Sequence, residues 1–195
     1  MNTTALGELK KHLRPGKTYR RAELAQWSRS VDRHLQTLVD EGSLKKLRTS
    51  LYYSPKQSAF GEVPADDHDL VRTFLKDDRF LLTSPNTYNA LGLGTTQLYN
   101  QRVVYNHKRH GEFVLGGRTY DFRVKHHFPK KTVTEEFLLV DLMNNLNELA
   151  EDQEELRART REKALSMNPT RLKRAVNEFA GASAKKFFSG FIDAR

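Results

Sequence analysis

The sequence predicts an α+β fold, and three observations support that prediction. Segments with the helical spacing of apolar residues alternate with short strand-like segments along the 195 residues. Apolar residues make up 37% of the chain and include 11 Phe and 7 Tyr, which is enough to build a core. The third observation is a helical pattern that leads directly into a short basic hairpin between Ser30 and Pro55.

The helix expected from Ser30 to Asp40 is the clearest single element. Its apolar residues recur at i, i+4, i+7 and i+8 and form one stripe. These residues are Val31, Leu35, Leu38 and Val39. Gly42 follows where glycine readily adopts the left-handed conformation that ends a helix. Ser28 or Ser30 is expected to cap the start of this helix, its hydroxyl accepting a free backbone N–H.

A hairpin is predicted directly after this helix. Its parts are the basic run Leu44–Arg48, a Thr49-Ser50 turn, the strand Leu51–Tyr53 and a stop at Pro55. Two shorter helices are expected upstream, around Leu6–Leu13 and Arg20–Trp27, with an extended Thr18-Tyr19 between them. Three helices and a hairpin predict a winged helix-turn-helix over residues 1–58, which would place a helix in the DNA major groove.

The charge distribution favours the same interpretation. The formal net charge is +9. Residues 1–56 hold 12 Lys and Arg against 5 Asp and Glu, a balance of +7. The balance is +3 over residues 57–133 and −1 over residues 134–195. A basic surface can also serve solubility, but concentration on one predicted motif favours phosphate binding.

Candidate DNA-contacting residues lie on the exposed face of the third helix and on the hairpin. They are Arg29, Ser30, Arg33, Gln36, Thr37, Lys45, Lys46 and Arg48. Arg pairs bidentately with guanine and Gln with adenine, so Arg33 and Gln36 are the expected base contacts. The three hairpin cations are expected to meet phosphate or the minor groove. The alternative for any single residue is an ordinary solvated helix face.

Residues 65–195 are predicted to form a second α+β domain, after a connector at Gln57–Pro64. An acidic helix start at Asp66–Asp69 leads to Leu75. A small antiparallel sheet and C-terminal helices follow. In the sheet, Gly116-Gly117 predicts a hairpin turn, and Tyr120, Phe122 and Val124 alternate with polar residues, which predicts a half-buried strand. The expected strands are Phe80–Thr83, Arg102–Asn106, Glu112–Leu115 and Arg118–Val124; the expected helices are Ser84–Leu91, Glu135–Leu149, Glu151–Lys163 and one from Asn168. The last segment, Lys185–Ile192, is rich in Phe and must bury against its own domain or a partner.

Catalytic, cofactor and metal sites are not expected. The chain has no Cys, which removes disulfides and thiolate ligands and suits a reducing compartment. The loop Gly92–Gln97 has no Lys partner and follows a helix, so it fails as a phosphate-binding loop. His107, His110, His126 and His127 lack carboxylates at ligand spacing, so a basic rim is expected there. No signal peptide or membrane-spanning segment is visible.

Several motifs in this order resemble the AbiEi-type antitoxins of type IV toxin–antitoxin systems. The matching strings are Arg33–Leu35 with Leu38, Gly42 and Leu44, then Leu51–Pro55, Phe60–Pro64, Leu82–Gln97, and Val114–Gly116 with Tyr120 and Phe122. Ser50 stands where that family usually has Gly, and Ser84-Pro85 replaces a Gly-containing helix start.

The resemblance implies a cytoplasmic transcriptional autorepressor without catalytic activity. Its winged helix would bind inverted repeats in the double-stranded DNA of its own promoter, and the rest would oppose a nucleotidyltransferase-like toxin. Two other functions stay open on the residues alone. One is a nucleic-acid-processing enzyme that uses the winged helix for targeting, and the other is a protein-only adaptor that uses the Phe-rich tail.

Overall fold

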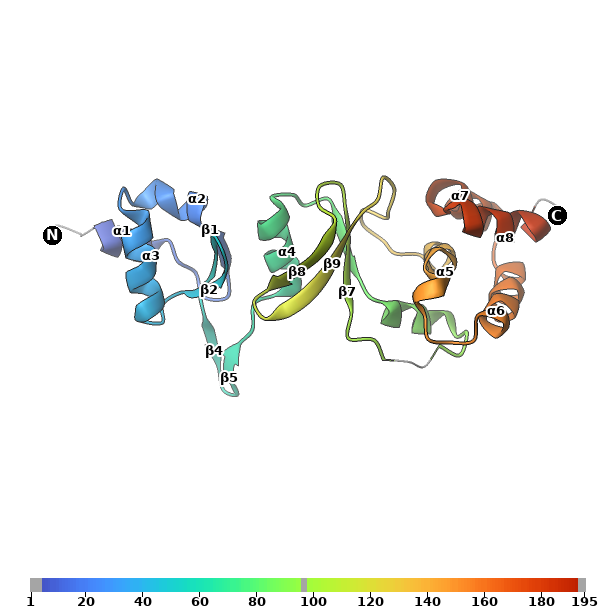
Figure 1. Ribbon diagram of the computed structural model, residues 1–195, viewed down its shortest axis with the longest axis horizontal. Helices are drawn as coiled ribbons and strands as arrows, with labels where there is room; N and C mark the ends of the chain where they lie inside the picture. Colours follow the sequence, from blue (N-terminus) through green and yellow to red (C-terminus); the bar gives the residue numbers. More distant parts are fainter. Residues whose placement is uncertain (1–4, 96–97, 193–195) are drawn as a thin grey trace. The chain divides into compact units, whose positions relative to one another are not determined.

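The computed structural model describes residues 5–95 and 98–192 and confirms a mixed α+β chain with small antiparallel sheets (Figure 1). The chain folds into two compact units. The first unit comprises Met1–Arg79 and Lys108–Tyr120, and the second comprises Phe80–His107 and Asp121–Arg195. The residues between 65 and 79 therefore group with the N-terminal elements. The domain boundaries 1–58 and 65–195 that the sequence suggests stay a prediction.

The first unit begins with four helical elements and a three-stranded sheet. These elements are α1 (Ala5–Lys11), β1 (Thr18–Arg20), α2 (Arg21–Leu24), the 3₁₀ helix η1 (Ala25–Trp27), α3 (Val31–Asp40), β2 (Lys45–Arg48) and β3 (Leu51–Tyr53). The sheet is antiparallel in the order β1-β3-β2. The predicted apolar stripe of α3 lies in a core with Leu9, Leu24, Leu44 and Tyr52. Burial of this stripe is what holds α3 against α1, α2 and the sheet.

The two ends of α3 differ from each other in how well the sequence predicted them. Gly42 has φ of +77°, and the Leu44 N–H donates to the Leu38 carbonyl at 2.9 Å, which confirms the predicted left-handed end. The predicted serine cap is wrong. Ser30 occupies the N-cap position, but its hydroxyl accepts no helix N–H. Ser28 instead accepts the N–H of Ser30 at 3.2 Å, and its hydroxyl also lies 2.7 Å from Nδ1 of His34.

The predicted connector at 57–64 is wrong as well, because this segment forms a second hairpin. Strands β4 (Lys56–Ser58) and β5 (Gly61–Val63) pair antiparallel, with Gln57 opposite Glu62. The turn-forming residues of this stretch close a tight turn, so they do not make an open loop. Helix α4 (Asp67–Leu75) follows, and its N-cap Asp66 accepts the Asp69 N–H at 2.8 Å, as an acidic helix start should.

A four-stranded sheet has the order β6-β7-β9-β8, and the division between the units passes through β9. Its strands are β6 (Phe80–Thr83), β7 (Arg102–Asn106), β8 (Gly111–Leu115) and β9 (Arg118–Val124), all close to the predicted bounds. Tyr120 and Phe122 are fully buried, as the alternation predicted. Val124 is 45% exposed, so the alternation does not hold at the end of this strand.

Helices form most of the second unit. They are the 3₁₀ helices η2 (Pro85–Leu91) and η3 (Leu146–Glu148), and the α-helices α5 (Glu135–Asn144), α6 (Gln153–Ser166), α7 (Pro169–Phe179) and α8 (Ala182–Ile192). The predicted single helix 135–149 therefore ends at Asn144. Part of the Gly92–Gln97 loop lies outside the described residues. Phe188 and Phe191 are buried in the core of this unit, so the Phe-rich tail packs internally.

A buried polar network lies at the centre of the second unit. The carboxylate of Asp141 accepts hydrogen bonds from Tyr88 at 2.8 Å and Tyr105 at 2.9 Å, and from the Lys125 ammonium at 2.9 Å. The Asn145 amide donates to both tyrosine hydroxyls. Burial of the rings, followed by the charge of Asp141, raises the pKa of both tyrosines. The buried carboxylate is thus satisfied by several partners, as a buried charge must be.

Candidate nucleic-acid interface

The predicted polar face of α3 is at the surface. Arg29 and Ser30 precede the helix, and Arg33, Gln36 and Thr37 lie on it; all five are exposed. The apolar stripe on the opposite side of α3 fixes this orientation, because it is buried in the core. The structure therefore exposes all five residues that the sequence singled out here, but it places Arg29 and Ser30 before the helix and not on its face.

A surface hollow of about 550 Å³ lies at the N-terminal end of α3. It is lined by parts of α1, η1 and α3, and both Arg29 and Arg33 contribute to its wall. No Asp or Glu is among its lining residues, and among the described residues neither arginine has a carboxylate partner. Free backbone N–H groups and the positive end of the helix dipole also favour anions at such a place. The described lining of the hollow is therefore electropositive.

Two other residues of this face already make local hydrogen bonds. The Gln36 amide nitrogen donates to the Asp40 carboxylate at 2.7 Å, one helical turn away. The Thr37 hydroxyl donates to the backbone carbonyl of Arg33 at 3.1 Å. The amide nitrogen carries two N–H donors, so Gln36 can keep this bond and still offer one N–H and its carbonyl oxygen to adenine. Its orientation is set by the bond to Asp40.

An ion pair that the sequence did not reveal joins α3 to α2. The Arg21 guanidinium donates to both carboxylate oxygens of Asp32, at 2.6 and 2.5 Å. This hydrogen bonding lowers the pKa of Asp32 and raises that of Arg21. The pair lies at the surface, so its main effect is to orient α3 and to neutralise two charges beside the candidate interface.

A second contact that the sequence did not reveal fixes the approach to α3. His34 is buried beneath the exposed face, and its Nδ1 lies 2.7 Å from the Ser28 hydroxyl. This contact holds the turn that carries Arg29 and Ser30. The spacing of Ser28 and His34 gave no signal, because the hydrogen bond crosses the junction between η1 and α3.

The three hairpin cations have three different environments. Lys45 forms an ion pair with Glu62 of β5 at 2.6 Å. Arg48 lies over the ring of Phe113 at 5.0 Å and over that of Phe74 at 5.7 Å. Lys46 is exposed, and it has no ion-pair or ring partner among the described residues. Lys46 is therefore the hairpin cation best prepared to meet a phosphate.

Arg48 belongs to a cation–aromatic cluster that only the tertiary structure assembles. Arg109 lies over the same two rings, 4.6 Å from the centre of Phe74 and 5.9 Å from that of Phe113. The rings are themselves 5.2 Å apart. Cation–π contacts of this kind stabilise a guanidinium in its position over the rings. Arg48 thus helps to dock the β2–β3 hairpin on α4 and β8, and the rings restrict the positions in which its N–H groups can meet a phosphate.

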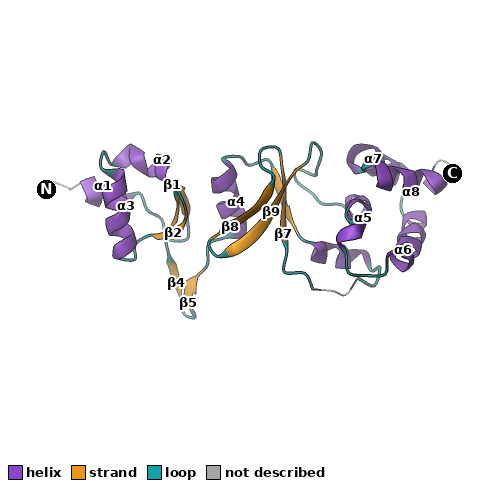
Figure 2. Ribbon diagram, viewed as in Figure 1, coloured by secondary structure: helices purple, strands orange, loops and turns teal. Residues whose placement is uncertain are grey.

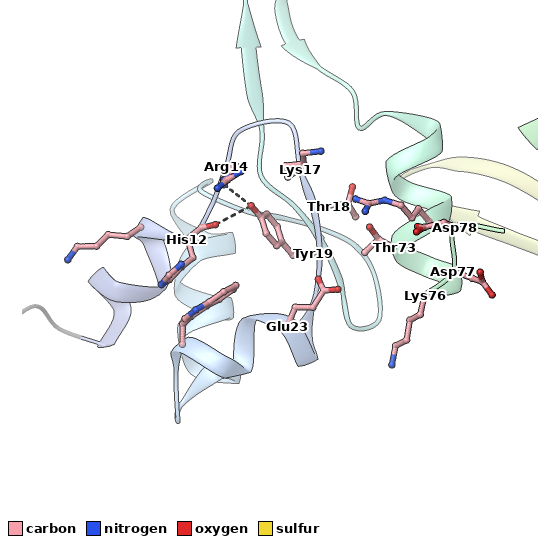
Figure 3. Close-up of a pocket in the computed structure, with 13 residues that line it drawn as sticks. His12, Arg14, Lys17, Thr18, Tyr19, Glu23, Thr73, Lys76, Asp77 and Asp78 are labelled. Atoms are coloured by element: carbon pink, nitrogen blue, oxygen red, sulfur yellow. Dashed lines mark hydrogen bonds between the residues drawn. The ribbon is translucent and has the colours of Figure 1, made fainter. Parts of the chain in front are cut away.

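A second pocket of the first unit, of about 530 Å³, is also rich in charged residues (Figure 3). Its cations are largely compensated by nearby carboxylates. Lys17 and Arg72 pair with Asp69, at 3.8 and 2.5 Å. Three carboxylate residues, Glu23, Asp77 and Asp78, are also among the residues that line this pocket. Compensation of this kind makes this pocket a poorer phosphate site than the hollow beside α3.

The four histidines flagged in the sequence are exposed, and His107 stacks on Phe128 with ring centres 4.8 Å apart. Within residues 5–95 and 98–192, no three His, Asp or Glu side chains are grouped so that they could hold a metal ion. In the same residues no helix has both the length and the apolar character needed to cross a membrane.

Comparisons of the chain with protein-family models, with curated proteins and with solved structures find no match. The function is therefore inferred from the surface of the first unit and from the motifs in the sequence.

Proposed function

We propose that the protein is a double-stranded-DNA-binding transcriptional regulator whose first unit is a winged helix-turn-helix. The order α1, β1, α2, α3 and the β2–β3 hairpin fits that arrangement, with α3 as the recognition helix. The single observation that supports it best is the hollow at the start of α3. Arg29 and Arg33 line that hollow, and no carboxylate is among its described lining residues.

The proposed mechanism separates affinity from sequence choice. Arg29 and Lys46 contact phosphates and release counterions, so binding weakens as salt rises. Arg33 reads guanine from the major groove, and Gln36 reads adenine with its carbonyl oxygen and the N–H that is not bonded to Asp40. The Arg21–Asp32 pair and the Ser28–His34 contact keep α3 and its approach in place. Phosphate contacts then set the register in which the bases are read.

The resemblance to AbiEi-type antitoxins supports a narrower proposal. In it, the protein represses its own operon by binding inverted repeats in the promoter, and it opposes a nucleotidyltransferase-like toxin. The motifs that resemble this family include Leu51–Pro55 and Phe60–Pro64 of the first unit. In this proposal the protein has no catalytic activity.

DNA binding is tested by fluorescence anisotropy with a labelled duplex from upstream of the protein's own reading frame, at several salt concentrations. The triple variant Arg29→Ala/Arg33→Ala/Lys46→Ala should lose most of its affinity. The matched control Arg171→Ala/Arg174→Ala/Lys186→Ala removes the same charge from α7 and α8. An equal loss of affinity in both variants would show that only the net charge matters, and it would contradict the assigned DNA-binding face.

The antitoxin role has its own test. If the neighbouring reading frame encodes a nucleotidyltransferase-like protein, expression of that protein alone should arrest growth, and co-expression of this chain should restore it. Growth arrest that this chain does not relieve would refute the antitoxin role while leaving DNA binding intact.

A further inference from the structure

The tip of the β4–β5 hairpin carries a fully exposed aromatic side chain, that of Phe60. In the ribbon view this hairpin stands out from the three-stranded sheet of the first unit (Figure 2). Exposed single apolar residues are common on proteins. A full Phe ring at the end of a projecting hairpin is unusual, because it gains nothing from the fold. Such a ring is free to contact a ligand.

The hairpin holds Phe60 in a defined position. The Ser58 hydroxyl donates to the Gly61 carbonyl at 2.8 Å and accepts the Phe60 N–H at 3.3 Å. Gly61 has φ of +106°, a conformation that favours glycine. These contacts restrict the backbone of the turn. Binding through the Phe60 ring therefore costs little backbone conformational entropy.

The base of the hairpin is joined to the candidate interface. Glu62 of β5 pairs with Lys45 of β2 at 2.6 Å. The Tyr53 hydroxyl of β3 donates to the Val63 carbonyl at 2.6 Å. The β4–β5 and β2–β3 hairpins are therefore linked through two side chains, and Lys46 follows Lys45 directly in β2.

The surroundings of Phe60 favour nucleic acid over protein as its target. Its neighbours in the hairpin are small or polar, namely Gln57, Ser58, Ala59 and Gly61, and Lys56 is an exposed cation. The carboxylate of Glu62 is already neutralised by Lys45. A protein-binding anchor is normally surrounded by a wider apolar patch that excludes water. An isolated apolar side chain at the tip of a hairpin, with the exposed Lys56 at the base of the same hairpin, resembles the side chains that insert between base pairs.

We propose that Phe60 inserts between adjacent base pairs of bound DNA from the minor groove and bends the duplex. This inference depends on the proposed DNA binding. Insertion separates two stacked base pairs and stacks the ring on a base. The wedge adds affinity with little dependence on sequence, because every base offers a flat face. It would explain why an aromatic ring is kept in water at the tip of a rigid hairpin.

The test measures affinity by anisotropy and bend angle by energy transfer between dyes at the two ends of the upstream duplex. Wild-type protein should bend the duplex by about 20–90°. Phe60→Ala should bind about 5- to 150-fold more weakly, the factor expected for loss of one base–aromatic stack, and should bend less. Phe60→Leu should retain part of the bend, since Leu is also a wedge residue. Leu98→Ala removes another highly exposed apolar side chain, from the second unit, and should change neither quantity.

The outcomes separate this proposal from the one on which it depends. If Phe60→Ala binds and bends DNA as wild type does, the wedge is refuted and DNA binding stands. If Phe60→Ala keeps DNA binding but loses association with a second copy or with a toxin, the tip contacts protein and the wedge is likewise refuted. If wild-type protein fails to bind the duplex at low salt, both proposals fail together.

Discussion

Arg21 of α2 donates hydrogen bonds to both carboxylate oxygens of Asp32 on α3, one from Nε at 2.6 Å and one from Nη2 at 2.5 Å. A bidentate pair of this kind is directional, so it restricts rotation of α3 against α2. Asp32 lies on the helix that is proposed to read DNA. Because its carboxylate pairs with Arg21, this arginine is not available to bind a phosphate. Orientation and charge at the interface are therefore set by the same pair.

Replacing Asp32 should consequently strengthen non-specific DNA binding. In Asp32→Asn the negative charge is removed and Arg21 is released, so one more phosphate contact can form. The slope of log affinity against log salt should steepen by up to about 0.9. Anisotropy titrations across a salt series measure this slope. Glu154→Gln removes an exposed carboxylate from α6 and serves as the control. An affinity gain of the same size in the control would show a general charge effect.

Arg33→Ala should relax specificity at one base pair of the preferred site. Loss of a bidentate contact with guanine costs about 1–3 kcal/mol on that site and much less on others. Binding to a set of duplexes, each with one base pair changed, measures the effect position by position. Unchanged affinity for the preferred duplex would show that Arg33 does not read a base.

Lys46→Ala should act differently from Arg33→Ala. A lost phosphate contact weakens binding to all sequences alike and reduces the salt slope by about 1. The same salt series on specific and unrelated duplexes distinguishes the two kinds of contact. A loss of affinity for one sequence alone would show that Lys46 contacts a base and not a phosphate.

The network around Asp141 predicts a pH dependence of stability. Because burial raises the pKa of Tyr88, this hydroxyl keeps its proton in the folded chain above about pH 10, where the unfolded tyrosine loses it. The unfolded state then binds fewer protons, so stability falls as pH rises, by at most about 1.4 kcal/mol per pH unit for one such group.

Tyr88→Phe isolates this contribution. At about pH 8 the variant should be less stable by about 1 kcal/mol, because Asp141 loses one hydrogen-bond donor. Between about pH 10 and 11.5 the difference from wild type should shrink, since the variant lacks the titrating group. Urea unfolding followed by circular dichroism at each pH provides the comparison. A difference that stays constant across this range would contradict the raised pKa.

Gly42 and Gly190 should respond in opposite ways to alanine. Gly42 has φ of +77° with open space around it, so Gly42→Ala meets only backbone strain, worth about 1–2 kcal/mol. Gly190 lies within α8 without a positive φ, and a Cβ there also meets open space. Gly190→Ala should therefore stabilise the chain by about 0.5–1 kcal/mol. Thermal unfolding measures both, and changes of the same sign would contradict this explanation.

The elements with a strong local pattern were predictable. The apolar stripe and Gly42 predicted α3 and its end, and Gly116-Gly117 between alternating residues predicted the β8–β9 hairpin. Prediction failed at the serine cap, at the connector and at the end of α5, which stops at Asn144 and not at Leu149. At the cap, the outcome depended on the bond of Ser28 to His34, a contact that spacing does not encode.

The sequence by itself determined the α+β class, the exposed polar face of α3 and the concentration of positive charge in residues 1–56. These follow from periodicity and composition, which are local properties of the chain. Only the tertiary structure decided which of those charges are available. It paired Lys45 with Glu62, placed Arg48 on two aromatic rings, left Arg29, Arg33 and Lys46 without an ion-pair partner among the described residues, and raised Phe60 on a hairpin. Each of these depends on which residues distant in sequence meet in space, which no local pattern records.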